Sequence, residues 1–409
     1  MTKFKVITGL LISFVAVFII WTAFFKSDHE HQATQHKHSE QGHAEQQTQE
    51  NYNNVVSVDV KYVDGVLHTL IAKQKGTQQS IGYQSSLDYG QTWSHEVTII
   101  NADNAFRFKR GNDARLAISG NSLVAVWMTR VEGAPHNAGP MMAMRSDDKG
   151  ATWQKSAMPA DWNGPHGFFA MAGSKEAINL VWLDSREKVE KGSQGLRFSQ
   201  SRDGGKTWSV NNTLDAQTCA CCWNTVKFNN DDFYVLYRDK KPSDMALGKI
   251  DADLNWQRIG TVGDFGWDFD GCPHVGGGLA FDSKNDLIHA TVTTGKSDQA
   301  GAYYLHSANN GLSWSEPMLL GDNSSFHTDI AVNNGDITVV WDRARETGMQ
   351  IVKASSSDKG ITWTQAEMLS DGLSHASHPI IIDMESKQLI MWTESEENGA
   401  TVIKTSIVE

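Results

Sequence analysis

The chain has few cysteines, few prolines and no excess of basic residues. Four cysteines and eight prolines in 409 residues exclude a disulfide-dense scaffold and a proline-rich unfolded composition. Its 36 lysines and arginines are outnumbered by 48 aspartates and glutamates, so the formal net charge is −12. We expect no nucleic-acid partner, because no basic face is evident to neutralise phosphates. A small anionic ligand is still compatible, since a local arginine cluster can oppose the global charge.

Only the amino terminus contains a long uncharged hydrophobic run. Residues 6–25 carry no charge, and their length matches the roughly 20 residues of a bilayer-spanning helix. Lys3 and Lys5 precede the run, which favours a cytoplasmic amino terminus. No Ala-x-Ala-like cleavage site follows. We therefore expect residues 1–26 to be an uncleaved, single-pass signal anchor in the cell membrane. A removed signal peptide is the alternative; both place the remainder on the periplasmic or extracellular side.

Residues 27–54 have almost nothing to bury and are rich in histidine, glutamine and glutamate. This composition predicts a disordered stalk. Its five histidines could bind Cu²⁺, Zn²⁺ or Ni²⁺ through neutral imidazoles. The alternative is a solvated tether whose histidines bind nothing.

An eight-residue pattern recurs along residues 55–409. Its clearest copy is Ser-Arg-Asp-Gly-Gly-Lys-Thr-Trp at 201–208, and related copies lie at 86–93, 146–153, 307–314 and 356–363, with a remnant at 253–256. The closing tryptophans are 60, 55, 48, 58 and 49 residues apart. The Asp and Ser side chains can hydrogen-bond the backbone of a turn, Gly supplies a positive φ, and Thr and Trp re-enter a strand. Repeats of this length between strand patterns predict the blades of a propeller.

The pattern resembles the Asp-box, or BNR, repeat of the sialidase-like β-propellers. The resemblance covers roughly residues 52–409 and implies an all-β propeller. Paired strand patterns support it, at 55–62 with 66–72, 114–119 with 122–128, 167–173 with 177–183, 223–228 with 233–237, 275–281 with 287–293, 328–332 with 337–341, and 379–383 with 389–392. Seven pairs with six turns predict seven blades, the last without its turn and outer strand. Six blades is the alternative, because well-known sialidases have six.

Strand direction predicts which loops share a face. If each blade runs outward from the axis, the repeated turns lie on one face and the loops entering each blade lie on the other. That second face should carry ligands, because loops on a rigid scaffold often hold functional residues. Its candidate ligand-binding residues are the arginines at strand ends, namely Arg115, Arg130, Arg186, Arg238 and Arg343.

All four cysteines fall on the same predicted face. Cys219, Cys221 and Cys222 precede the fourth blade, and Cys272 precedes the fifth with His274 close by. Disulfides are expected outside the cytoplasm, although a Cys221–Cys222 or Cys219–Cys221 bridge would be strained. Thiolates with His274 would instead suit copper or zinc. The sequence leaves both interpretations open, and both predict one local site between blades four and five.

The resemblance also implies a catalytic hypothesis. Sialidases of this family use an arginine triad, a tyrosine nucleophile and an aspartate acid/base. Asp113 is the candidate acid, and Tyr237 is the tyrosine that comes nearest the predicted ligand face. The family's amino-terminal Arg-Ile-Pro pattern is absent.

Three functions follow from these observations. The first is an anchored extracytoplasmic propeller that binds a metal ion or a small anionic ligand on its Arg/His/Cys face. The second is an exo-acting glycoside hydrolase of sialidase type, and the third is a protein-interaction platform. Binding is favoured, because the cysteines and the His-rich stalk converge on metal handling whereas no convincing catalytic tyrosine is present. Whether the protein is an enzyme, and its oligomeric state, stay open at this point.

Overall fold

A computed structural model of the protein describes residues 54–108, 111–135, 137–187 and 192–409. The predicted anchor and the predicted stalk, apart from its last residue, lie outside these ranges. Within them, no helix is long and apolar enough to cross a membrane.

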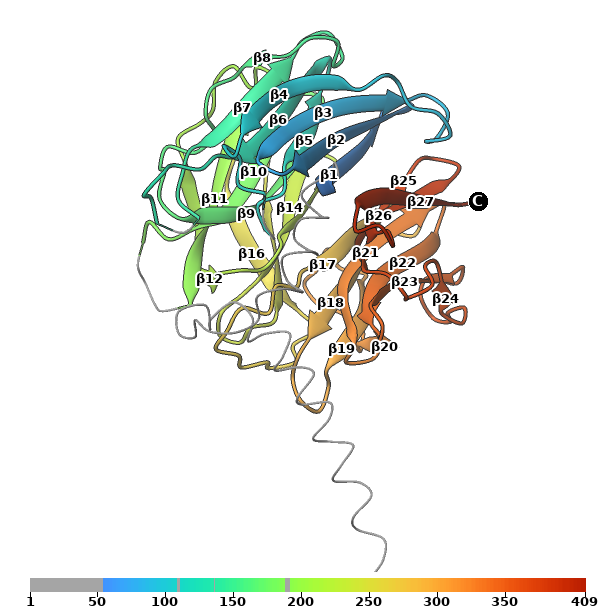
Figure 1. Ribbon diagram of the computed structural model, residues 1–409. Helices are drawn as coiled ribbons and strands as arrows, with labels where there is room; N and C mark the ends of the chain where they lie inside the picture. The colour runs from blue at the N-terminus through green and yellow to red at the C-terminus, as the bar shows by residue number, and fades with distance from the viewer. Residues whose placement is uncertain (1–53, 109–110, 136, 188–191) are drawn as a thin grey trace, which may run out of the picture. The chain divides into compact units, whose positions relative to one another are not determined.

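The described residues form seven antiparallel sheets around one axis, coloured from blue to red along the chain (Figure 1). The first blade consists of β1 (Asn54–Val63), β2 (Val66–Lys75), β3 (Gln78–Ser86) and β4 (Val97–Asp103). The second consists of β5 (Arg115–Ser119), β6 (Ser122–Met128), β7 (Met141–Ser146) and β8 (Gln154–Lys155). The third consists of β9 (His166–Gly173), β10 (Ile178–Asp184), β11 (Ser193–Ser201) and β12 (Asn212–Cys219).

Three further blades have four strands and the seventh has three. The fourth blade consists of β13 (Thr225–Asn229), β14 (Asp232–Arg238), β15 (Met245–Ile250) and β16 (Trp256–Val262), and the fifth of β17 (Gly277–Asp282), β18 (Leu287–Thr294), β19 (Gly301–Ser307) and β20 (Met318–Gly321). The sixth consists of β21 (Ser325–Asn333), β22 (Asp336–Ala344), β23 (Met349–Ser356) and β24 (Glu367–Met368). The seventh consists of β25 (Ala376–Asp383), β26 (Gln388–Ser395) and β27 (Thr401–Val408). The prediction of an all-β, seven-bladed propeller is confirmed, and the six-bladed alternative is wrong because β25 to β27 form a sheet of their own.

The repeated turns join the third and fourth strands of six blades. In the first of them, the Ser86 hydroxyl donates to Asp88 Oδ1 at 2.8 Å and accepts the Gly90 N–H at 2.9 Å. Asp88 in turn accepts the N–H and the hydroxyl of Thr92, at 2.8 and 2.6 Å. Hydrogen bonds from Thr92 and Ser86 hold the pKa of Asp88 at about 2. The turn is therefore closed by its own side chains, as Asx-type turns are.

Each turn packs on the blade before it, which explains its glycine. Gly150 has φ +92°, and a side chain there would collide with the ring of Tyr83 in the first blade. The Tyr83 hydroxyl lies 3.3 Å from the Lys149 carbonyl, and His68 Nδ1 lies 2.7 Å from that hydroxyl. The same arrangement joins blades five and six, where Tyr304 bonds the Lys359 carbonyl at 3.2 Å beside Gly360.

The ring closes by packing, with no strand shared between the first and last blades. One buried cluster combines Val60 and Leu67 of the first blade with Leu389 and Met391 of the seventh, and Trp93 packs against it. The Thr401 N–H donates to Asn54 Oδ1 at 2.8 Å beside this seam. Closure holds the seven innermost strands around one axis, and this positions the site described below.

The contact between Gly150 and Tyr83 predicts a large effect of adding one methyl group. Gly150→Ala should lower the free energy of unfolding by about 2–4 kcal/mol, because it combines an unfavourable φ with overpacking. Gly65→Ala is the matched control, since Gly65 has φ +79° but no atom lies within 4 Å of the added carbon. Its cost should be about 1–2 kcal/mol. Chemical denaturation measures both, and equal losses would contradict the packing role of the turn.

Candidate functional site

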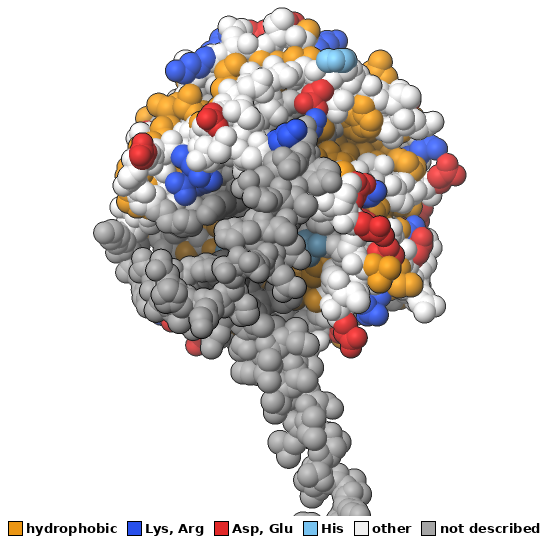
Figure 2. Space-filling model, in the orientation of Figure 1, with side chains coloured by type: hydrophobic (Ala, Val, Ile, Leu, Met, Phe, Trp, Pro, Cys, Tyr) orange, Lys and Arg blue, Asp and Glu red, His pale blue; other side chains and the backbone are white. Residues whose placement is uncertain are grey.

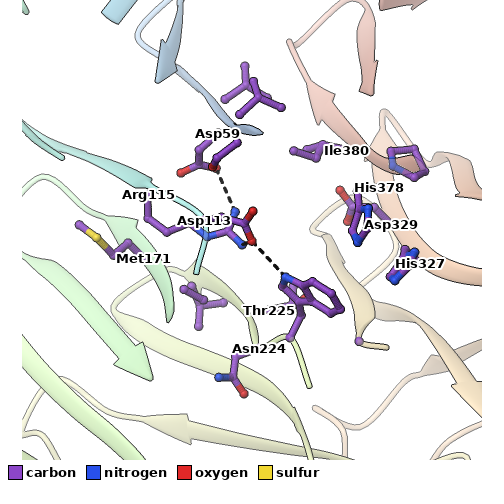
Figure 3. Close-up of a pocket in the computed structure, with 18 of the residues that line it drawn as sticks. Asp59, Asp113, Arg115, Met171, Asn224, Thr225, His327, Asp329, His378 and Ile380 are labelled. Atoms are coloured by element: carbon purple, nitrogen blue, oxygen red, sulfur yellow. Dashed lines mark hydrogen bonds and ion pairs between the residues drawn. The ribbon is translucent and has the colours of Figure 1, made fainter. Parts of the chain in front are cut away.

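The axis of the propeller contains a cavity of about 450 Å³. All seven innermost strands or the loops entering them contribute to its wall. The charged side chains that line it are Asp59, Lys61, Asp113, Arg115, Lys227 and Asp329. Asp59, Asp113 and Arg115 face His327, His378 and Asp329 across the cavity (Figure 3). The end of the cavity where the innermost strands begin is called the mouth, and it is formed by Asp113, Trp223, His327 and His378.

Trp223 is the aromatic centre of the mouth. Its ring lies 5.3 Å from that of His327 and 5.2 Å from that of His378, and the two imidazoles stack at 3.8 Å. On its other side the indole N–H donates to Asp113 Oδ2 at 3.2 Å. Phe168 packs edge-on to Trp223, with ring centres 5.5 Å apart. The indole is thus held by residues from several blades.

Three residues at or beside the mouth have a strained backbone. Phe168, His274 and His378 have φ of 55°, 50° and 55°, in the left-handed region that side chains other than those of Asn, Asp and Gly rarely adopt. Phe168 and His378 lie where the register of β9 and β25 shifts against the second strand. A bulge redirects a side chain, at a cost of roughly 1–3 kcal/mol per strained residue. Strain concentrated in this way is typical of a functional site.

His327 is fixed by acceptors at both ring nitrogens. Nδ1 lies 2.8 Å from Asp342 Oδ2, and Nε2 lies 3.1 Å from the His274 carbonyl oxygen. A carbonyl and a carboxylate both accept, so the ring donates to both of them when it is an imidazolium with a proton on each nitrogen. Both ring nitrogens of His327 are therefore directed at oxygen acceptors beside Trp223.

Asp342 is the carboxylate that contacts His327. Its side chain is fully buried and also accepts the backbone N–H groups of His327 and His378, at 3.0 and 2.9 Å. Burial alone would raise the pKa of Asp342, but the charge and hydrogen bonds of His327 outweigh it and hold the pKa at about 2. The ligand atoms of His327, Asp342 and His378 lie within 4.8 Å of one another. Both ring nitrogens of His327 are already in contact with oxygen atoms of Asp342 and His274.

Arg115 is the predicted arginine that the structure brings to the cavity. It comes from the innermost strand β5, and Nη2 lies 3.2 Å from Asp113 Oδ2 while Nη1 lies 3.9 Å from Asp59. Its Nε donates to the Phe169 carbonyl at 3.0 Å. The guanidinium is held in place and stays partly exposed to the cavity, with 17% of the side chain accessible.

The other four predicted arginines do not line the cavity. Each lies at or after the outer end of a second strand, so its side chain points between loops or blades. Arg186 pairs with Asp184 and Asp161, and Arg343 donates to the side chain of Gln350. Arg238 is buried and donates to the carbonyls of Ser243 and Thr293. Arg130 bonds through its backbone to Ala105. Of the five predicted arginines, the axial cavity is thus lined by Arg115 alone, because strand order within the blade, more than strand end, determines access to the axis.

The two candidate catalytic residues lie in different environments. Asp113 is at the mouth, as its position before the second blade predicts. Tyr237 is on the second strand β14 and is fully buried in the core cluster between blades three and four. Its hydroxyl donates to Asp215 at 3.0 Å, and burial raises its pKa. A nucleophile needs access and a low pKa, so this environment argues against the nucleophilic role predicted for Tyr237.

The four cysteines come together behind Trp223. Cys219, Cys221 and Cys222 are buried and Cys272 is exposed. The sulfurs of Cys219 and Cys222 lie 2.9 Å apart, and the thiols of Cys221 and Cys272 interact. The ring of His274 lies against Phe168 and Trp223, 6.1 and 6.5 Å away. Metal binding by these residues stays a prediction.

Sequence reasoning did not single out Trp223, His327, His378 and Asp342. Their positions in the sequence could have identified them. Trp223 and the two histidines lie at or just before the start of innermost strands, and Asp342 lies near the end of the second strand β22. Only the register shifts, which no sequence pattern marks, turn them toward one another.

Two solved structures with this fold are informative. An ulvan lyase of polysaccharide lyase family PL25, bound to -[GlcA(1-4)Rha3S]-, has a TM-score of 0.56 at 10% identity, over 88% of this chain and 93% of that chain. A Trypanosoma rangeli sialidase with the inhibitor DANA has a TM-score of 0.50 at 13% identity, over 75% of this chain and 55% of that chain. No protein-family model matches the chain, and no curated protein matches it in sequence. These likenesses establish the propeller fold.

The buried carboxylate of Asp342 predicts a defined acid dependence of stability. Its folded pKa of about 2 lies below the ordinary 3.8, so its contribution is complete above pH 3.8 and disappears as the pH falls toward 2. Asp342→Asn should lower the free energy of unfolding by about 3–5 kcal/mol near neutral pH. The difference from the wild type should shrink on acidification through that window. Urea denaturation at several pH values tests this, and a difference that stays constant down to pH 2 would contradict the ion pair.

Proposed function

We propose that the protein binds a sugar that carries a carboxylate, in the axial cavity. Trp223 is the platform for the sugar ring, and His327 and Arg115 attract the carboxylate from opposite sides. The observation that carries the proposal is the indole of Trp223, presented at the mouth between Asp113 and two stacked imidazoles. Asp113 completes the mouth as an acceptor for sugar hydroxyls.

The size and lining of the cavity suit such a ligand. About 450 Å³ falls within the usual range of small-ligand sites, roughly 300–1,000 Å³. Aromatic rings with a few fixed polar groups are the usual lining of these sites. The mouth has the rings of Trp223, His327 and His378 in contact with one another, and its polar groups are already held by hydrogen bonds. Side chains that are already held in place lose little conformational entropy when a ligand binds.

The charges at the axis leave room for an anion although the chain as a whole is acidic. Lys61, Arg115 and Lys227 line the cavity together with three carboxylates, those of Asp59, Asp113 and Asp329. Burial raises the pKa of Asp329. Arg115 is the guanidinium among the three cations, and a guanidinium is the side chain best suited to bind a carboxylate.

The structural neighbours support an acidic sugar. One is bound to a polymer that contains GlcA, and the other to the inhibitor DANA. The self-closing Ser/Asp/Gly/Thr turns support the assignment of this chain to the sialidase-like Asp-box propellers. Residues 1–26 would anchor it in the membrane, with the propeller outside the cytoplasm.

The residues that line the cavity favour binding of a sugar over its hydrolysis. The described lining of the cavity contains no tyrosine, and Tyr237 is fully buried. The alternative, a sialidase-type hydrolase with Asp113 as acid, would therefore need a different nucleophile.

The proposal predicts selective binding that depends on Trp223. Calorimetry should detect binding of glucuronate or N-acetylneuraminate, and methyl glucoside should bind about 10-fold more weakly, a difference of ~1.4 kcal/mol. Trp223→Ala should weaken binding of the acidic sugar by about 10-fold or more, since truncation of a central aromatic anchor has effects of this size.

Trp162→Ala is the matched control. Trp162 is a partly exposed tryptophan that stacks on Arg186, 5.7 Å away, and does not line the cavity. The affinity of this variant for the acidic sugar should stay within about 2-fold of the wild type, as expected for a residue that does not contact the ligand. Equal losses in both variants, or equal binding of charged and neutral sugars, would refute the proposal. Turnover of a fluorogenic sialoside would instead establish the hydrolase alternative.

A further inference from the structure

The four cysteines behind the mouth lie in one cluster. Cys219 ends β12, and Cys221 and Cys222 lie in the loop that leads to Trp223 and β13. Cys272 lies in the loop between β16 and β17, two residues before His274. Cys219 and Cys222 have their sulfurs 2.9 Å apart. The Cys221 thiol interacts with all three other thiols, and Cys272 bonds to Cys221, so a Cys219–Cys222 pair leaves Cys221 for Cys272.

We propose that the protein carries two disulfides, Cys219–Cys222 and Cys221–Cys272, which tie the loop of Trp223 to the loop of His274. This pairing uses every cysteine and avoids the two strained alternatives, the adjacent Cys221–Cys222 and the one-residue Cys219–Cys221 loop. A Cys219–Cys222 bridge has two residues between its cysteines, the spacing of Cys-x-x-Cys disulfides.

The surroundings of the sulfurs favour disulfides over a metal. The 2.9 Å between the two sulfurs is shorter than the about 3.8 Å between thiolates that share a tetrahedral zinc, and longer than the about 2.05 Å of a formed disulfide. The charges nearby discriminate better. The buried guanidinium of Arg238 acts electrostatically on Cys219 and Cys222. Lys240 acts on Cys272 but is offset by Asp270, 3.7 Å away. A metal cation would be repelled by Arg238, whereas a neutral disulfide would not.

Formation of the bridges needs an oxidant of the disulfide class, such as an exported thiol oxidoreductase in its oxidised form. A thiolate of the chain attacks one sulfur of that disulfide and forms a mixed disulfide, and the other sulfur leaves as a thiolate. The second cysteine of the pair then attacks the mixed disulfide and releases the oxidant as a dithiol. Each bridge removes two hydrogens from the chain and adds them to the oxidant. Predicted export would keep the bridges oxidised.

The Cys221–Cys272 bridge would link two sides of the mouth. Trp223 directly follows Cys222, and its ring contacts that of His274 at 6.5 Å. The His274 carbonyl in turn accepts from His327 Nε2. A covalent link between the loops therefore fixes the indole of Trp223 relative to the ring of His327. Strand pairing does not fix them, because β12 and β17 belong to different sheets.

Disulfide mapping tests the pairing without any ligand. The exported full chain is purified without reductant, alkylated while denatured and digested with trypsin. Peptides 207–227 and 259–284 should be recovered as one linked species, four hydrogens lighter than the two reduced peptides and without alkylation. Free, fully alkylated cysteines, or stoichiometric zinc or copper in the purified chain, would overturn the proposal.

Variants and partial reduction identify the partners. Cys221→Ser should abolish the link between the peptides and leave the internal bridge of 207–227, whereas Cys219→Ser should keep the link. Because Cys272 is exposed, mild reduction of the wild type should expose Cys221 and Cys272 to alkylation first. This second measurement uses the native chain, so it stays decisive if a variant does not fold. A link that survives Cys221→Ser, or first alkylation of Cys219 and Cys222, would refute the pairing.

Discussion

The structure depends on one small unit, the turn in which an aspartate bonds the backbone and hydroxyl of a threonine four residues later. In the Asp88 turn these bonds are 2.8 and 2.6 Å long, and the same pair recurs at Asp148, Asp203 and Asp358. Five of the turns present a glycine to the preceding blade, at Gly90, Gly150, Gly205, Gly311 and Gly360. Repetition of that contact orients these blades against their neighbours. The innermost strands then begin around a single axis, and the mouth residues meet there although they are far apart in sequence.

Much of the fold was predictable from the sequence, because its signals are local. The turn pattern and the alternating apolar residues determine strand positions and blade number, and the missing outer strand of the seventh blade followed from the missing turn. Ring closure by Trp93, Leu67 and Leu389 was not visible, since it joins residues from the two ends of the propeller.

The site was predictable in location but not in composition. The candidate residues were assigned to one end of the blades, but distance from the axis depends on which strand carries the residue. Arg115 belongs to an innermost strand and lines the cavity, whereas Arg238 and Tyr237 belong to a second strand and are buried between blades. The meeting of His327, His378 and Trp223 further requires register shifts in β21 and β25. A periodic pattern does not encode such shifts, because each one breaks the period.

The surface and the interior of the propeller have different electrostatic roles. Figure 2 shows acidic and basic side chains interspersed on one face, without a single continuous basic patch in that view. The mouth, in contrast, contains the ring of His327 in contact with the buried carboxylate of Asp342, so His327 lines the cavity and Asp342 does not. The central claim is that this geometry receives an acidic sugar. Crystals soaked with glucuronate test it most directly. The account predicts a sugar ring against Trp223 with its carboxylate between His327 and Arg115. An empty mouth at saturating glucuronate, or a sugar bound only on the face of the repeated turns, would contradict it.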